Sequence, residues 1–223
     1  NSMKFCSDLE ADFRKASNSE LAIPMENYMK NNFSFLGIKT EQRRAIFKSN
    51  YEQNKAEVKS NFRAIAWELF QMKEREFHQT AIDLLLKEFK KNFVLEDIQL
   101  IEKMIITNSW WDSVDTIAKY ILGGYLLQFP SETLKVIERF SNSENMWLNR
   151  SAILFQLSYK EKTNFEILKS ECEKHKDSNE FFIQKAIGWA LRDYSRFNPN
   201  GVEAYVNSTN LKPLSRKEAL RLL

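Results

Sequence analysis

The chain repeats a short pattern, a small residue followed by an aliphatic one, and the interval between copies leaves few possible folds. The copies are RRAIFK, QTAIDL, VDTIAK, RSAILF, QKAIGW and KEALRL. Their aliphatic residues lie 36, 35, 36, 34 and 33 residues apart, at Ile46, Ile82, Ile117, Ile153, Ile187 and Leu220. A period in this range is typical of stacked helical hairpins, each of which adds one layer to a continuous core.

Composition and hydrophobic spacing both indicate helices. The chain has 5 glycines and 4 prolines among 223 residues, which is far below average usage, so it lacks the turn residues that sheets need. The segments 57–72, 94–107 and 163–174 carry apolar residues at helical spacing. We therefore predict an all-α fold and one domain over residues 1–223. It would be a solenoid of stacked antiparallel helix pairs, with one helix of each pair lining a concave face.

Two rows of positions in the repeat are predicted to line that concave surface. They lie outside the apolar face of the helix that contains the repeated aliphatic residue. The row two positions before the aliphatic residue holds Arg44, Thr80, Asp115, Ser151, Lys185 and Glu218. The row two positions after it holds Lys48, Leu84, Lys119, Phe155, Trp189 and Leu222. Cations beside aromatic rings suit a polyanion, since they can neutralise phosphates and stack on bases. The alternative is an ordinary solvated helix face, on which lysines are common.

Few residues are available for metal, nucleotide or covalent chemistry. His78 and His175 are the only histidines and lie in no metal or triad motif, and Cys6 and Cys172 are lone cysteines. The glycine pair at 123–124 lies in an apolar helical run with no preceding strand, which argues against a phosphate-binding loop. We expect neither a metal nor a cofactor.

Charge and hydropathy indicate a soluble cytoplasmic protein. The chain is 43% hydrophobic and 28% charged, with a net charge of +3, which is only a weak indication of a polyanionic partner. Its longest apolar run, YILGGYLLQF, is too short to span a bilayer, and the N-terminus does not resemble a signal peptide. Asn1 and Ser2, which precede Met3, look like a cloning remnant.

The stretch TNSWWDSVDTIA, residues 107–118, carries unusual aromatic surface and negative charge for one helix start. We predict Ser109 as the N-cap, which places Asp112 where a carboxylate interacts with the cap and the helix dipole. Asp115 has no such structural role and shares a face with Trp111, four residues earlier. The alternatives are that Asp115 is an exposed charge or pairs with Lys119, and that Trp111 only fills the core.

Several motifs together resemble the bacterial DNA alkylation repair family of HEAT-like-repeat glycosylases. They are YMKNNFSFLGIKTEQRR (28–44), SWWDSVD (109–115), MWLNRSAILFQL (146–157), FFIQKAIGWALRDYSR (181–196) and PLSRKEAL (213–220). The resemblance covers essentially the whole chain in the same order and spacing. It implies an all-helical solenoid that cups duplex DNA, and excision of alkylated purines with a positively charged base, such as 3-methyladenine and 7-methylguanine, in base excision repair.

The resemblance also assigns roles. The carboxylate that assists cleavage corresponds to Asp115, its aromatic neighbour to Trp111, the cleft arginine to Arg150, a second cleft tryptophan to Trp189 and an N-terminal tyrosine to Tyr28. Further DNA contacts are expected from Lys185, Lys119, Arg44 and Lys48. Arg150 could instead pair structurally with an acid of a neighbouring repeat, and Trp189 could belong to the core.

This chemistry needs few groups. A purine methylated at N3 or N7 leaves as a neutral base without a general acid, so the protein has to stabilise the sugar cation, which a fixed carboxylate can do. We expect hydrolysis by water without lyase activity, since no lysine stands out as a nucleophile. The protein is expected to act as a monomer on double-stranded DNA beside the bacterial nucleoid. The alternatives are a non-enzymatic binder of branched or distorted DNA, and a helical-repeat scaffold for a protein partner.

Overall fold

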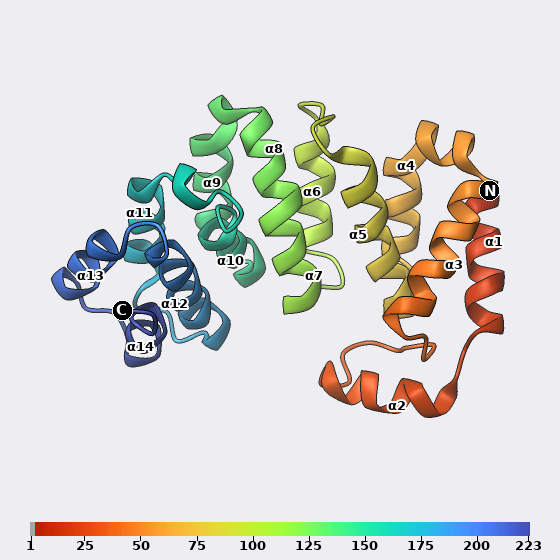
Figure 1. The fold of residues 1–223 in the computed structure, drawn as a ribbon, viewed down its shortest axis with the longest axis horizontal. Coiled ribbons are helices and arrows are strands. Elements are labelled where there is room, and N and C mark those ends of the chain that lie inside the picture. Colours follow the sequence, from red (N-terminus) through yellow and green to blue (C-terminus); the bar gives the residue numbers. More distant parts are fainter. Residues whose placement is uncertain (1–2) are drawn as a thin grey trace. The chain divides into compact units, whose positions relative to one another are not determined.

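The computed structural model describes residues 3–223, and its regular elements are all helices (Figure 1). No strand occurs within this range, although one isolated bridge joins Ser34 to Glu74. The prediction of an all-α fold is confirmed. Asn1 and Ser2, predicted to be a cloning remnant, lie outside the described residues. The chain divides into two compact units, one up to Val94 and one from Leu95 to Leu223. The single domain over residues 1–223 stays a prediction.

The first unit consists of five helices and a long link between the second and third. Its helices are α1 (Lys4–Lys15), α2 (Ser19–Tyr28), α3 (Thr40–Gln53), α4 (Lys55–Phe70) and α5 (Arg75–Phe89). Helix α1 packs against α3 and α4, and α4 packs against α5. The buried Glu76 carboxylate holds the link by accepting hydrogen bonds from the backbone N–H groups of Leu36, Gly37 and Ile38, at 2.9, 2.9 and 3.2 Å.

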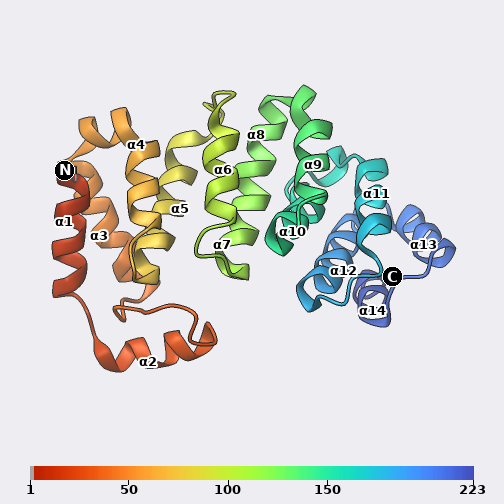
Figure 2. The same ribbon diagram turned by 180° about the vertical axis from the view of Figure 1, so that it is seen from behind.

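The second unit continues as packed helix pairs, visible from both sides in Figures 1 and 2. Its helices are α6 (Asp97–Ile105), α7 (Trp111–Thr116), the π-helix η1 (Ile117–Leu122), α8 (Gly123–Gln128), the 3-10 turn η2 (Pro130–Glu132), α9 (Thr133–Ser141), α10 (Met146–Leu154), the 3-10 turn η3 (Lys160–Lys162), α11 (Phe165–His175), α12 (Phe181–Ser195), α13 (Pro199–Ser208) and α14 (Pro213–Ala219). Helix α10 packs against α9, α11 and α12, and α12 packs against α13 and α14. No helix in the described part of the chain is long and apolar enough to cross a membrane.

The repeated aliphatic position forms much of the core, but not in every copy. Residues 82, 117, 153 and 187 are buried isoleucines, as predicted. Ile46 and Leu220 are only half-buried, and their neighbours Phe47 and Ala219 are buried instead. In these two copies the core place is therefore taken by the residue next to the repeated position.

Part of the predicted polar face is buried, which corrects the assignment of both rows. Thr80 and Leu84 in α5, Ser151 in α10 and Phe155 just after α10 are almost completely inaccessible. The Thr80 hydroxyl donates to the Glu76 carbonyl, and the Ser151 hydroxyl donates to the Trp147 carbonyl. A helix inside a stack contacts neighbours on several sides, so a position off the main apolar stripe can still be buried.

Candidate functional site

The helix that carries Asp115 begins one residue later than predicted. Helix α7 runs from Trp111, its N-cap is Trp110, and no side chain caps it. The Ser109 hydroxyl donates to the Ile105 carbonyl and so completes the end of α6. The predicted Ser109 cap is therefore wrong, because the hydroxyl satisfies the last turn of the preceding helix. Asp112 lies in the first turn of α7, where a negative charge meets the positive end of the helix dipole.

Asp115 forms a two-point ion pair with Arg150, which lies on α10. Arg150 Nε donates to Asp115 Oδ1 at 2.8 Å, and Nη2 donates to Oδ2 at 2.9 Å. The side chains keep only 6% exposure for Arg150 and 14% for Asp115. This geometry fixes both oxygens of the carboxylate, because the planar guanidinium matches its fork. The alternative partner, Lys119, instead places its Nζ 5.0 Å from the Tyr120 ring centroid.

Two asparagines position α10 and with it Arg150. The Asn145 side chain caps the helix by accepting from the Trp147 and Leu148 N–H groups. The Asn149 amide donates to the carbonyls of residues 140, 141 and 143, which close the end of α9. Arg150 Nη1 donates to the Phe182 carbonyl on α12. The guanidinium therefore ties α7, α10 and α12 together at one point.

An aromatic cluster lies beside the ion pair. The rings of Trp110, Trp147 and Phe182 contact one another with centroids 5.9, 5.3 and 5.0 Å apart. The Arg150 guanidinium carbon lies 5.6 Å from the Phe182 ring centroid and 5.9 Å from that of Trp189. Sequence reasoning missed Trp147 and Phe182 as neighbours of the site. The available signal was an aromatic residue at the start of each of three successive repeats.

The electrostatics of the pair are a balance between burial and the neighbouring cation. Burial raises the pKa of the Asp115 carboxyl above its ordinary value, and the hydrogen bonds and charge of Arg150 oppose that rise. The negative charge of Asp112 raises it slightly further. Arg150 thus favours the ionised form of a carboxylate that burial alone would protonate more readily.

The structure brings some predicted site residues together within the second unit. Trp111 is half-buried one turn before Asp115 on α7, and half-buried Trp189 packs against the hydrophobic core while facing Arg150. Lys185 is half-buried, and its Nζ lies 3.3 Å from Glu218 Oε1 on α14. The Lys185 ammonium is therefore shared with an acid.

The other predicted site residues belong to the first unit. Tyr28, at the end of α2, is 66% exposed. Arg44 and Lys48 are exposed on α3 and border a pocket of about 300 Å³, and Arg44 Nε lies 3.3 Å from Asp83 Oδ2. The role of these residues in DNA binding stays a prediction, as do the roles of Asp115, Trp111, Arg150, Trp189, Lys185 and Lys119.

Comparison with known proteins identifies the family. The family model for DNA alkylation repair enzymes matches residues 9–223. The chain belongs to the DNA alkylation repair enzyme family. The chain is similar to the solved structure of a predicted DNA alkylation repair enzyme from Enterococcus faecalis. The two sequences are 36% identical, and the structures superpose with a TM-score of 0.85 over 93% of this chain and 96% of that chain.

More distant structures share the fold of this DNA alkylation repair family member. The AlkD2 protein of Streptococcus mutans is 16% identical, with a TM-score of 0.60 over 90% of this chain and 96% of that chain. The smu.31 protein of the same species is 17% identical, with a TM-score of 0.60 over 82% of this chain and 92% of that chain. At these identities the likeness concerns the fold alone. No curated protein sequence matched the chain.

Proposed function

We propose that the protein is a DNA N-glycosylase that removes cationic alkylated purines, such as 3-methyladenine and 7-methylguanine, from duplex DNA. The observation that carries the proposal is the Asp115 carboxylate on α7. Arg150 on α10 holds both of its oxygens, and Trp111 lies on the same helix as Asp115. Membership of the DNA alkylation repair family supports the substrate class. Water is the final acceptor, and the base is released without strand cleavage.

Asp115 is assigned the electrostatic role. An alkylated purine that already carries a positive charge leaves as a neutral molecule, so positive charge moves to the sugar as the glycosidic bond breaks. A carboxylate close to that sugar stabilises the developing cation. Because Arg150 fixes both oxygens before DNA arrives, the carboxylate needs little reorganisation during the reaction. Arg150 also keeps Asp115 ionised against the effect of burial.

Trp111 and Trp189 are assigned to lesion recognition. Both indole rings are half-buried and so keep part of their surface accessible. A cationic base over an indole face gains roughly 0.5 to 2 kcal/mol of cation–π attraction that a neutral purine does not gain. This difference would favour the lesion over the normal base at the same position.

Arg150 has capacity for a second role. Its Nε, Nη1 and Nη2 each donate one hydrogen bond within the protein. Each Nη atom has a second N–H group beyond these bonds, and the small exposed part of the side chain, 6%, is what a backbone phosphate would contact. We therefore assign Arg150 to positioning Asp115 and, through these N–H groups, to holding the DNA backbone beside the lesion, without reading sequence.

Release of free methylated purines from dimethyl-sulfate-treated duplex tests the proposal. We expect wild-type protein to release them and Asp115→Asn to be slower by about 10²- to 10³-fold, the usual effect of removing one electrostatic stabiliser. Asp112→Asn is the matched control, since it makes the same chemical change on the same helix away from Arg150, and it should stay near wild type. A circular dichroism melt of each variant verifies that it is folded.

Two results would count against the assignment. Equal release by wild type and Asp115→Asn would remove Asp115 from the reaction. No release by the wild type, although it is folded and bound to DNA, would leave the non-enzymatic DNA-structure binder as the better hypothesis.

A further inference from the structure

A groove of about 560 Å³ lies in the second unit, about one helical turn away from the Asp115–Arg150 pair. Lys119 on η1 lines it and follows Asp115 by four residues. Asp193 on α12 lines it and follows Trp189 by four residues. Its lining also includes Tyr120, Lys160, Arg196 and Phe197. Two elements that hold the candidate site therefore continue into this groove, although neither Asp115 nor Trp189 lines it.

The groove carries an excess of positive charge. Lys119, Lys160 and Arg196 line it, and Asp193 is the one acid among its lining residues. Within residues 3–223, neither of the two lysines forms a salt bridge. Arg196 Nε lies 3.7 Å from Asp193 Oδ1, and the arginine side chain is 57% exposed, so water screens this pair and the guanidinium stays accessible. Such an excess of accessible cations suits a phosphate group, the anion of a DNA strand.

Two exposed aromatic rings line the same groove. Tyr120 is 50% exposed and Phe197 is 41% exposed, and they are two of the four exposed aromatic residues in the range 3–223. The Lys119 Nζ atom lies 5.0 Å from the Tyr120 ring centroid, which puts a cation beside an accessible ring. Cations for the backbone beside rings for the bases are typical of proteins that bind single strands. In a paired duplex the base faces cover one another, so these rings can contact only a base that has left the stack.

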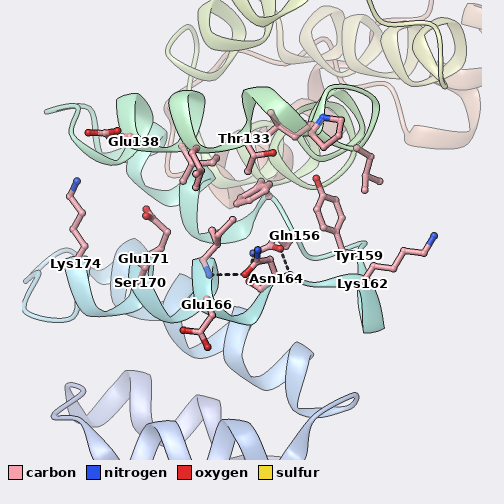
Figure 3. A pocket seen from close by; sticks show the side chains of 17 residues that line it. Thr133, Glu138, Gln156, Tyr159, Lys162, Asn164, Glu166, Ser170, Glu171 and Lys174 are labelled. Atoms are coloured by element: carbon pink, nitrogen blue, oxygen red, sulfur yellow. Dashed lines mark hydrogen bonds between the residues drawn. The ribbon is translucent and has the colours of Figure 1, made fainter.

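The larger groove of the same unit lacks this combination. It measures about 790 Å³ and lies between α8, α9 and α11 (Figure 3). The charged residues that line it are three acids and two lysines, namely Glu138, Glu166, Glu171, Lys162 and Lys174. Among the described residues that line it, none is an exposed aromatic. Its charge does not suit a phosphate, and it offers no accessible ring to a base.

We propose that the groove lined by Tyr120, Lys160 and Phe197 binds an unpaired nucleotide of a DNA strand. The base stacks on the exposed rings, and the phosphate is held by Lys119, Lys160 and Arg196. The volume of about 560 Å³ lies within the range of small-molecule sites in proteins, roughly 300 to 1,000 Å³. The inference rests on the proposed function for the choice of DNA as the strand, but this binding requires neither an alkylated base nor base release.

Fluorescence anisotropy titrations with three duplexes of one sequence test the proposal. One duplex is fully paired, one has a single bulged thymidine, and one has a bulged abasic sugar at the same position. Wild-type protein should bind the thymidine bulge about tenfold more tightly than either of the others, because only that duplex offers a base to the rings. Equal affinity for the thymidine and abasic bulges would overturn the proposal, since any preference would then come from deformation of the duplex.

Two variants of Phe197 show whether the ring is responsible. Phe197→Leu keeps an exposed apolar side chain but has no ring face, so the preference for the thymidine bulge should fall to about twofold or less. Phe197→Tyr keeps a ring and should keep the preference. Both variants should bind the fully paired duplex as the wild type does. An unchanged preference in Phe197→Leu would contradict the stacking of the base on this ring.

A lysine variant tests the phosphate contact. Lys160 has a φ of 56°, in the left-handed region that asparagine adopts more readily than lysine, so Lys160→Asn should fold normally. The variant should weaken binding of the thymidine-bulged duplex several-fold. Lys162→Asn is the matched control and should bind as the wild type does, because Lys162 is an exposed lysine of the same turn that lies outside the groove. Equal effects of the two variants would contradict a phosphate contact at Lys160.

A free nucleotide is the other possible source of the same ligand chemistry. Displacement of the bulged duplex by an equimolar amount of thymidine monophosphate would assign the groove to free nucleotides and overturn the proposal. The titrations contain no alkylated base, so a wild-type protein that releases no methylated purine can still show the preference for the thymidine bulge. A protein that does release methylated purines can equally fail to show it, so the two proposals fail independently.

Discussion

The ionisation of Asp115 depends on the position of Arg150. Burial raises the pKa of this carboxyl group, and the two Arg150 hydrogen bonds oppose the rise. Removal of the cation in Arg150→Gln would let the pKa rise further. Since the proposed reaction needs the ionised carboxylate, the acid limb of the profile of kcat/KM against pH should move to higher pH in this variant. Base release from methylated duplex, measured across the pH range, checks this.

A second arginine in the same unit provides the control for that shift. Arg192 Nη1 lies 2.7 Å from Glu218 Oε2 and has no contact with Asp115. Arg192→Gln should therefore leave the acid limb in place, whatever it does to affinity for DNA. A fall in kcat/KM of Arg150→Gln by the same factor at every pH would mean that Arg150 does not act through the ionisation of Asp115.

Single residues were predictable from sequence where their partners are near in the chain. The i, i+4 spacing placed Trp111 and Asp115 on one helix, because helix geometry is local. The same rule proposed Lys119 as the partner of Asp115, whereas the structure pairs Asp115 with Arg150, 35 residues away. That contact depends on how one repeat packs on the next. The alternative that Arg150 pairs with an acid of a neighbouring repeat is confirmed, but the sequence did not show that the acid is Asp115.

At the level of elements, a glycine at the start of α8 allows this helix to lie close to the end of α10. The residues between α7 and α8 form the π-helix η1, which begins two residues after Asp115. A Cβ atom at Gly123 would lie 2.6 Å from the Phe155 carbonyl oxygen at the end of α10. Gly123→Ala should therefore lower the free energy of unfolding by about 1 to 3 kcal/mol, the usual effect of overpacking. Urea unfolding followed by circular dichroism measures this change.

The adjacent glycine is the matched control. Gly124 is half-buried in the same helix, so an alanine there should leave stability unchanged or raise it by roughly 0.5 to 1 kcal/mol through its better helix propensity. Equal stability of the two variants would mean that the approach of Gly123 to Phe155 is not tight.

Elements were predictable because the apolar spacing that defines a helix is carried by the segment itself. The segments 57–72, 94–107 and 163–174 coincide with α4, α6 and α11 to within three residues at each end. The boundary at Ser109 was wrong because its hydroxyl could complete one helix or begin the next, and only the fold selects between them. The burial of Thr80 and Phe155 likewise depends on helices on both sides of the one that carries them.

At the scale of the whole molecule, the predicted cation rows run through both compact units. Lys48 lies on α3 in the first unit, and Lys119 lies on η1 in the second. If one duplex contacts both units, each lysine that neutralises a phosphate adds about 0.9 to the slope of log affinity against log salt concentration. Each of Lys48→Ala and Lys119→Ala should then lower the slope by about 0.9, and the double variant by about twice that, whatever the DNA sequence.

Lys73 is an exposed lysine outside both rows, so Lys73→Ala is the control and should leave the slope unchanged. Titrations of a fluorescent duplex at several salt concentrations measure the slope. The slope could also stay unchanged in Lys48→Ala and fall in Lys119→Ala. In that case Lys119 contacts a phosphate and Lys48 does not, which would contradict a DNA-binding surface that includes Lys48.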